Sequence, residues 1–315
     1  MPWLRFIPET TNIDFVGWRY YAFAADGLLV LISIVSIALH GFNLGIDFTG
    51  GASVEAKAPY TIDLGALRSH IGGDGLGEVQ IQTVSSSGAC DNPAGSCVLI
   101  RAQPKGNVSG GAAIQTIQKQ LGPDYSIRNR VFIGPKVSQE LFRDGVIATI
   151  LAVLFISIYV AIRFEWQYGI GALVATGHDV FVTAGLFSVL QLDFTLNTVA
   201  ALLLLAGYSI NDTVIVFDRI RENRRKYKRM GLPSLINLST NQIATRTTLV
   251  SAATALSMLP LLFFGGPVLF NFSAAILFGI LVGTFSSTYV AAALLLYLPA
   301  PAGTIDEPAD DKAAA

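Results

Sequence analysis

The sequence predicts a polytopic α-helical membrane protein with six transmembrane helices and one small α+β domain. Of its 315 residues, 52% are hydrophobic and only 14% are charged, and the mean hydropathy is +0.55. Soluble domains carry about 25% charged residues. Six apolar stretches are long enough to cross a bilayer, and one long polar region, 40–142, separates the first of them from the second. These observations exclude a soluble globular protein.

The six predicted spans follow from the length that a bilayer requires, about 20 mostly apolar residues in a helix. The first stretch lacks the short apolar core and the A-x-A-like cleavage site of a signal peptide, so we interpret it as a retained anchor. The second to sixth spans form a bundle over 143–298. The predicted spans cover residues 22–39, 145–162, 168–190, 196–217, 243–264 and 270–298.

Basic residues set the predicted orientation. The predicted loop 218–242 between the fourth and fifth spans carries seven Lys and Arg residues between 219 and 229, and such loops stay on the cytoplasmic side. Counting spans outward then places residues 1–21 and 299–315 in the cytoplasm as well. The last segment is short, rich in Pro and Ala and acidic, so we expect it to be disordered. The basic segment is most simply a topology anchor, and a lipid-facing or ribosome-facing role stays open.

The region 40–142 reads as one extracytoplasmic domain. Alternating or apolar runs at 52–58, 78–84, 97–103 and 125–133 indicate strands. Apolar periodicity at 61–71 and 112–121 indicates two helices. The order is βαβ followed by βαβ, which is the ferredoxin-like pattern, with both helices on one face of an antiparallel sheet. The other face would stay free for a partner.

The two cysteines, Cys90 and Cys97, bracket a turn-rich segment of this domain. In an oxidising compartment the two thiols could close that loop as a disulfide. Free cysteines are the alternative, because spacing alone does not decide between them.

The sequence contains few features that are typical of an enzyme or of a cofactor-binding protein. Two cysteines and three histidines form no zinc-binding pattern, and the net charge of −1 gives no electrostatic case for nucleic acid. The GIDFTGG run, Gly45–Gly51, lacks the lysine and the spacing of a phosphate loop, and its glycines favour a tight exit from the membrane. Asp47 in this run is interpreted as a turn former rather than a catalytic acid. We expect no enzymatic activity, no metal and no cofactor.

Polar residues inside the fourth span are the first functional candidates. An ionisable residue at the centre of a span costs about 2.5–3.5 kcal/mol, so it usually faces protein or water. At about 100° per residue, Tyr208, Asn211 and Asp212 fall on one face of this helix. Asp212 lies roughly 9 Å from the cytoplasmic end of the span. It is a candidate protonatable acid, and a structural hydrogen bond between helices is the alternative.

A base and a second polar pair accompany Asp212. Counted from the cytoplasmic side, Arg246 in the fifth span has a similar depth, so the two side chains could pair. Displacing the guanidinium would then let the acid bind a proton. Alternatively, Arg246 extends to the interface. In the third span, His178 and Asp179 could relay protons, although neighbouring helical residues point about 100° apart and need not face one path.

Several motifs together resemble the SecD/SecF family of bacterial protein-export membrane proteins. GIDFTGG alone does not separate the two subunits of that family. The GYSINDT run that begins at Gly207 and leads into FDRIREN at Phe217 is the most diagnostic feature. The remaining matches are 134–141 (GPKVSQEL), His178-Asp179 and Arg246-Thr247-Thr248.

The resemblance implies an inner-membrane protein related to the resistance-nodulation-division (RND) transporters. It implies SecD as the partner that supplies six more spans, the SecYEG translocon, the accessory proteins YajC and YidC, and an emerging unfolded polypeptide as client. It also implies protons as the coupling ion, with sodium left open, and Asp212 and Arg246 as the acid and its basic partner. Protons crossing the interface with SecD would move the outer domain and so assist translocation.

Two other functions remain open at this stage. A small-molecule proton exporter of the same superfamily would need a substrate pocket. A 315-residue chain also lacks the duplicated halves that transporter repeats supply, unless a partner chain restores them. A passive translocon scaffold would use Asp212 and Arg246 only to hold helices together.

Overall fold

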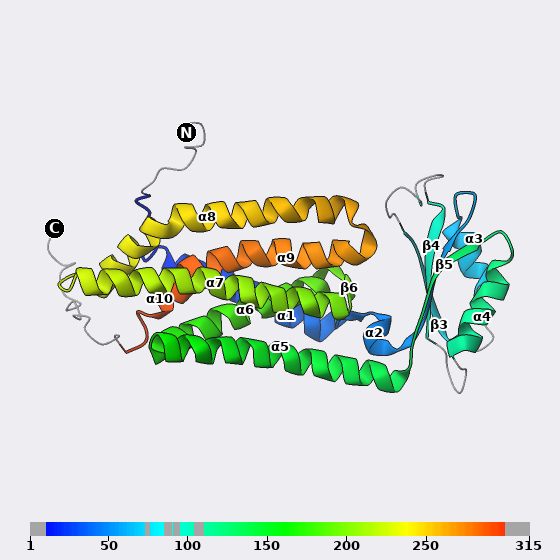
Figure 1. Cartoon of the computed structure of the whole chain (residues 1–315), viewed down its shortest axis with the longest axis horizontal. Coiled ribbons are helices and arrows are strands. Elements are labelled where there is room, and N and C mark those ends of the chain that lie inside the picture. The colour runs from blue at the N-terminus through cyan, green and yellow to red at the C-terminus, as the bar shows by residue number, and fades with distance from the viewer. Residues whose placement is uncertain (1–10, 73–75, 85–89, 91–94, 104–109, 300–315) are drawn as a thin grey trace.

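The computed structural model describes residues 11–72, 76–84, 90, 95–103 and 110–299. It has two parts, a bundle of long helices and a small α+β domain at one end of that bundle (Figure 1). The tail predicted to be disordered lies outside the described residues, apart from Pro299.

The bundle contains, among the described residues, six helices that are long and apolar enough to cross a membrane, as the sequence predicts. The fold class is therefore confirmed. The last of these helices continues through one π-helical turn, Ser287–Ala291, into the short helix α10 (Ala292–Leu294). The six are α1 (Arg19–His40), α5 (Pro135–Arg163), α6 (Trp166–Leu190), α7 (Leu196–Lys226), α8 (Leu232–Phe264) and α9 (Gly266–Ser286).

The basic segment 218–242 is mostly helical rather than a loop. Helix α7 continues to Lys226 and α8 begins at Leu232, so the connection is only 227–231. Arg, Glu and Lys are good helix formers, so the helices extend beyond the apolar stretches. Asn223 donates to Ser239 over 2.9 Å and holds the two extensions together.

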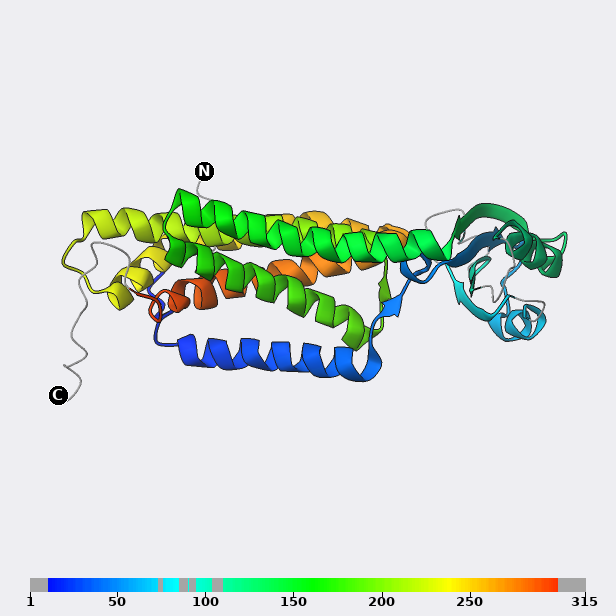
Figure 2. The same ribbon diagram turned by 90° about the horizontal axis from the view of Figure 1, so that it is seen from below.

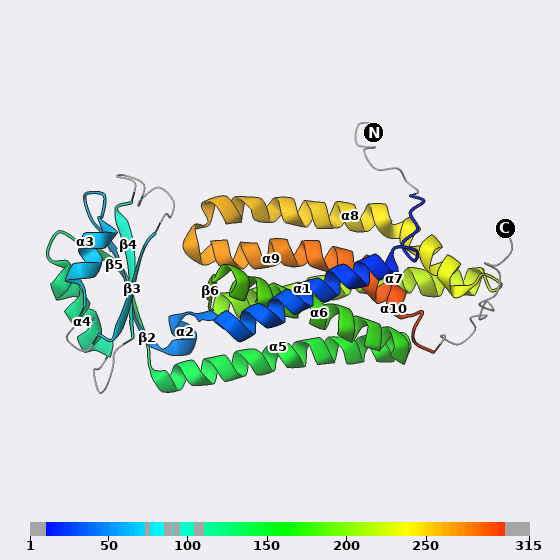
Figure 3. The ribbon, with the colours of Figure 1, turned by 180° about the vertical axis from the view of Figure 1, so that it is seen from behind.

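The small domain is ferredoxin-like, which confirms the predicted α+β pattern. Its sheet has the order β3-β4-β2-β5, and all neighbours in it are antiparallel. Helices α3 and α4 cover the face that points away from the bundle, and the opposite face is turned toward it (Figures 1 and 3). The elements are β2 (Gly51–Lys57), α3 (Leu64–His70), β3 (Glu78–Thr83), β4 (Cys97–Gln103), α4 (Gly110–Leu121) and β5 (Ser126–Ile133).

Alternation along the strands explains the core of this domain. On β2, Ala52, Val54 and Ala56 are fully buried, while Glu55 and Lys57 between and after them are not. Because successive strand residues point to opposite faces, one face of the sheet packs under the helices. Ile117 of α4 is fully buried in the same cluster. Burial of these side chains stabilises the domain.

A compact junction connects the bundle to the small domain. The two-residue strands β1 (Asn43–Leu44) and β6 (Asp193–Phe194) pair in parallel, and the short helix α2 (Ile46–Thr49) follows β1. Gly51 has a φ of 137°, and a Cβ there would lie 2.5 Å from the carbonyl oxygen of Ala102. The glycines therefore make a tight exit from the membrane helix, as the sequence indicates.

Asp47 has a role that the sequence does not reveal. Its carboxylate accepts the backbone N–H of Leu196, the first residue of α7, over 2.9 Å. It therefore caps a helix 149 residues away along the chain, where a negative charge is favoured by the helix dipole. The interpretation of Asp47 as a local turn former is replaced by this long-range contact.

Asp193 of β6 ties the domain to the bundle. It forms an ion pair with Arg101 of β4 at 2.9 Å and accepts a hydrogen bond from Asn43 at 3.0 Å. Its backbone oxygen accepts from Asn271 of α9 over 3.2 Å. One residue thus contacts the sheet of the outer domain, the strand after α1 and the sixth span.

Helices α1 and α6 pack closely through small residues (Figure 2). Ser36 and Ser188 share a hydrogen bond of 2.9 Å. At Gly185, an added Cβ would lie 2.1 Å from the Ser33 hydroxyl oxygen. Small side chains let the two backbones approach, which is the usual basis of helix association in a bilayer.

We expect Gly185→Val to destabilise the bundle by about 1–3 kcal/mol, because the new side chain overpacks the contact with α1. Gly177→Val on the same helix is the matched control, since a Cβ there meets nothing within 4 Å. Thermal unfolding of both variants in detergent measures the difference. Equal melting temperatures would contradict the close contact of α1 with α6.

We expect Arg101→Gln to loosen the junction. Losing a partly exposed ion pair costs about 1 kcal/mol, which corresponds to a roughly fivefold faster local opening. Amide hydrogen exchange at Gly45, whose N–H donates to Phe194 over 2.8 Å, reports that opening. Arg128→Gln on the same sheet is the control, because Arg128 pairs with Glu55 and not with the bundle. Unchanged exchange at Gly45 in Arg101→Gln would argue against the ion pair as a tie.

Candidate functional site

Asp212 lies in the middle of the bundle and is 1% exposed. Its Oδ2 lies 3.5 Å from the hydroxyl of Ser251 on α8, which donates to it. Its Oδ1 has no hydrogen-bond partner among the described residues. No cation of the described chain pairs with it, so a proton is the simplest way to neutralise this buried carboxylate.

Hydroxyl groups surround this acid. The hydroxyl of Ser251 shares a hydrogen bond of 2.7 Å with the hydroxyl of Thr284 on α9. It also accepts a hydrogen bond of 3.1 Å from Tyr208 of α7. Thr213, the residue after Asp212 on α7, shares a hydrogen bond of 3.0 Å with Ser287. These contacts bring α7, α8 and the sixth span together around Asp212.

Asp179 on α6 is fully buried next to this cluster. It accepts from the Ser209 hydroxyl of α7 over 2.5 Å and lies 3.0 Å from Nδ1 of His178. Gly283 of α9 leaves room for it, since a Cβ there would lie 3.2 Å from Asp179 Oδ2. His178, Asp179 and Ser209 therefore form one polar network in the structure.

The His178–Asp179 pair and Asp212 approach each other through α7. Ser209 and Asp212 are three residues apart on that helix, which places them on neighbouring faces about one turn apart. Ser209 donates a hydrogen bond to Asp179, and Asp212 accepts one from Ser251. The two polar groups are therefore consecutive along the same side of α7.

Asp26 is a site residue that the sequence analysis passed over. It lies on α1, is 5% exposed, and its Oδ1 is 3.8 Å from Nε2 of His178. A single acid within the first span was a usable signal, because ionisable residues in spans are rare. The sequence does not reveal that His178 is its neighbour, because the two residues are more than a hundred positions apart in the chain.

Arg246 does not meet Asp212, contrary to the predicted pairing. No hydrogen bond or ion pair joins these two described residues, and Arg246 is exposed. It lines a cleft of about 650 Å³ with residues of the α7 extension, among them Asp218 and Glu222. The Asn223–Ser239 and Asp212–Ser251 contacts fix the register of α7 on α8. In that register, Asp212 is level with Ser251, so Arg246 lies five residues, about 7.5 Å of helix, closer to the cytoplasmic end than the sequence count predicts.

Asn211 is likewise separated from the acid. The side chain of Asn211 is exposed, whereas Asp212 is buried and Tyr208 donates to Ser251 of the hydroxyl cluster. The three residues span a broad arc of the helix, because Asn211 and Asp212 are neighbours and point about 100° apart. The predicted polar face therefore divides into an inward part and an outward part.

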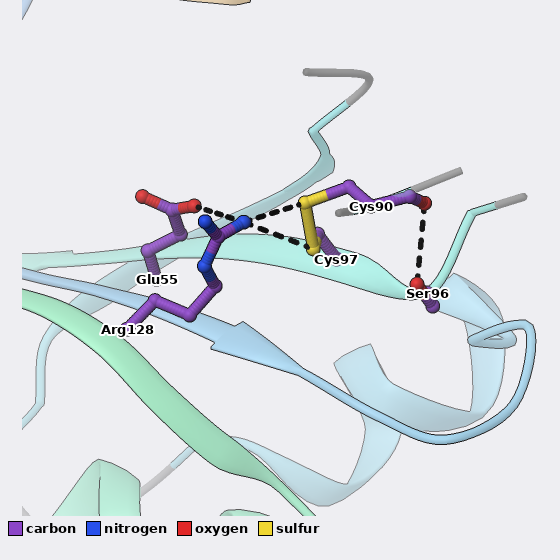
Figure 4. Close-up of a disulfide and its surroundings, with 5 residues drawn as sticks. All are labelled: Glu55, Cys90, Ser96, Cys97 and Arg128. Atoms are coloured by element: carbon purple, nitrogen blue, oxygen red, sulfur yellow. Dashed lines mark hydrogen bonds and ion pairs between the residues drawn. A yellow bond between two sulfur atoms is a disulfide. The ribbon is translucent and has the colours of Figure 1, made fainter. Parts of the chain in front are cut away.

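The two cysteines are joined by a disulfide in the structure (Figure 4). Arg128 of β5 donates to the Cys90 sulfur over 3.0 Å and lies 3.7 Å from the carboxylate of Glu55. Ser96 donates to the backbone oxygen of Cys90 over 3.2 Å. The bridge lies on the sheet face that carries no helix, far from the membrane network.

The cytoplasmic end of the bundle holds a separate ion pair. Arg224 of α7 is mostly buried and contacts Glu165, between α5 and α6, at 2.5 Å. The same guanidinium donates to the Tyr168 hydroxyl over 3.4 Å. Sequence reasoning assigned this arginine only to the basic anchor, but its contacts make it a structural tie between helices.

We expect Arg224→Gln to lower the unfolding free energy by about 1–2 kcal/mol, because it removes charge-assisted hydrogen bonds from a half-buried pair. Arg246→Gln is the matched control and should change stability by less than about 0.5 kcal/mol, as an exposed substitution does. Thermal unfolding of the isolated chain measures both. A larger loss for Arg246→Gln would show that Arg246 carries a contact absent from this arrangement.

Comparisons with known proteins place this chain among export proteins. Profiles for the SecD/SecF GG motif and for "Protein export membrane protein SecD/SecF, C-terminal" match residues 35–58 and 113–300. Translocase subunits named SecF from Rhodobacter capsulatus and Rickettsia bellii are 39% and 37% identical, and the alignments cover 94% and 93% of this chain and 91% and 95% of those proteins.

A solved structure shares the fold. The crystal structure of SecDF, a translocon-associated membrane protein from Thermus thermophilus, superimposes with a TM-score of 0.81 at 34% identity. The match covers 94% of this chain and 39% of that longer one. The sequence relatives and the shared fold agree, and the chain therefore belongs to the SecD/SecF family of protein-export membrane proteins.

Proposed function

We propose that this chain acts in Sec-dependent protein export, as its SecF relatives are named to do, by coupling proton movement through the membrane to motion of its outer domain. The observation that carries the proposal is Asp212, a buried carboxylate without a cation and with one oxygen unpartnered among the described residues. A carboxylate in that position is costly unless it binds a proton. Binding and releasing a proton therefore changes the free energy of the bundle.

The membrane potential supplies enough free energy for such a step. Moving one elementary charge across 100 mV is worth about 2.3 kcal/mol. That amount changes the ratio of two conformations by roughly fiftyfold. One proton per cycle is thus sufficient to bias the outer domain between two poses without ATP.

Helix α7 offers the mechanical connection. Asp212 lies 16 residues from its first residue, Leu196, which corresponds to about 24 Å of helix. At that end, Leu196 is held by Asp47 and neighbours β6, whose Asp193 binds Arg101 of the outer sheet. A small rotation or shift of α7 at Asp212 is therefore transmitted to the outer domain through two defined contacts.

Arg246 has a proposed role in a second state. In the structure it faces the cleft beside Asp218. Asp212 contacts Ser251, five residues from Arg246 on α8, so a sliding of α8 on α7 by about 7.5 Å together with a rotation of α8 would bring the guanidinium to the carboxylate. The pairing would favour release of the proton. Asp212 and Arg246 thus form the proposed proton relay, engaged in one state and separated in the other.

The proposed setting is the bacterial inner membrane, with both termini in the cytoplasm. The basic residues of the α7–α8 connection support this orientation. The solved SecDF chain is more than twice the length that this chain covers, which supports SecD as the partner that supplies further spans. SecYEG, YajC, YidC and the translocating polypeptide are the other proposed partners, and the coupling ion is the proton.

We expect Asp212→Asn to abolish the stimulation of export by a proton gradient while leaving insertion and folding intact, because Asn keeps the shape but cannot exchange a proton. The measurement is the export rate of a secretory precursor into vesicles that contain this chain, SecD and SecYEG. It is made with and without a proton gradient at matched expression. Asp144→Asn, which alters an exposed acid of α5, should behave as the wild type.

Two outcomes would reject the coupling role. Equal stimulation of Asp212→Asn and the wild type would make the carboxylate structural and favour a passive scaffold. Proton-driven efflux of small molecules without any effect on precursor export would favour an exporter instead.

A further inference from the structure

Asp26 is a buried acid that the proposed relay does not use. It is 5% exposed, and neither of its carboxyl oxygens has a hydrogen-bond partner in the described chain. Only an imidazole nitrogen approaches it, at 3.8 Å, which is too far for a hydrogen bond. An acid in this condition calls for an explanation, because buried polar groups are normally satisfied.

The hydrogen bonds of its neighbours distinguish Asp179 from Asp26. Ser209 donates to Oδ2 of Asp179, and Oδ1 lies 3.0 Å from Nδ1 of His178, a contact whose donor depends on the tautomer of the ring. An ionised Asp179 with His178 as the Nδ1 donor satisfies both oxygens. The imidazole that donates to it through Nδ1 has its second nitrogen directed at Asp26. An imidazolium at His178 balances the charge of Asp179.

Counting charges then assigns a proton to Asp26. With His178 positive and Asp179 negative, an ionised Asp26 would leave one uncompensated negative charge in a buried site. Helix α1 packs on α6 and on the π-helical turn. On α6, Nε2 of His178 lies 3.8 Å from Asp26, and Asp179 contacts the other nitrogen of that ring, while Tyr289 of the turn stacks on Phe285. None of these offers Asp26 a further positive charge.

We infer that Asp26, together with His178 and Asp179, forms a second protonation site inside this chain, in which Asp26 binds the exchangeable proton. The proton adds to one carboxylate oxygen of Asp26 and leaves it again as H⁺, while His178 keeps both ring protons and its positive charge. The site connects α1 to α6 and, through Ser209, ends about one turn from Asp212 on α7. The inference deepens the proposed function and rests on it for any role in export.

Infrared spectroscopy tests the protonation state directly. The purified full chain with ¹³C-labelled aspartate should show the C=O stretching band of a protonated, buried carboxyl group at neutral pH, which an ionised carboxylate lacks. Asp26→Asn should remove one such band. Asp212→Asn is the matched control and should leave the Asp26 band in place. His178→Gln should add a band, because Asp179 loses its positive neighbour and binds a proton.

The outcomes separate this inference from the proposed function. A spectrum of Asp26→Asn that superimposes on the wild type would overturn the inference, even if Asp212→Asn abolishes proton-stimulated export. Loss of the Asp26 band would support it, even if export proves independent of Asp212. Asp26→Leu, which suits an apolar span, provides the same reading if the Asn variant does not fold.

Discussion

The constraint on which the bundle depends is that a carboxyl group buried among membrane helices needs donors, a cation or a proton. The three buried acids meet this constraint differently. Asp179 receives hydrogen bonds from His178 and Ser209 and belongs to the permanent structure. Asp212 and Asp26 each have at least one oxygen without a donor in the described chain. The acid that the fold satisfies holds helices together, and the two that it leaves partly unsatisfied are the ones for which we propose proton exchange.

A small number of contacts also joins the two parts of the molecule. The outer domain has its own apolar core under α3 and α4, so it is packed separately from the bundle. Near the membrane it is tied to the bundle through Asp193 and Asp47. A second connection is the chain itself, because only Gly134 separates strand β5 from helix α5 (Figure 1). Both acids lie at the outer end of α7, the helix that carries Asp212. In the proposed mechanism, these few polar contacts at one end of α7 are where motion would be transmitted to the outer domain.

The sequence predicted what depends on local pattern and missed what depends on register. Span length and strand alternation are local, so the six helices and the ferredoxin-like order followed directly. The depth of Arg246 depends on how α7 slides along α8, and the Asn223–Ser239 contact that sets it pairs two residues from different helices. Asp26 and Asp47 act on partners more than a hundred residues away, which no spacing rule reveals. The charged residues 218–226 predict a loop but continue α7, because Arg, Glu and Lys are also good helix formers.

The chemistry of the groups around Asp212 fits a site that changes its charge. A hydroxyl both donates and accepts, so it can satisfy a carboxylate as a donor and a protonated acid as an acceptor. Ser251 already has both possibilities in the structure, because it contacts Tyr208 and Thr284 as well as Asp212. A permanently paired arginine would only donate and would stabilise the ionised state alone. In the proposed cycle, the hydroxyls around Asp212 therefore serve both protonation states while Arg246 stays apart from the acid, and the base acts only after the helices have moved.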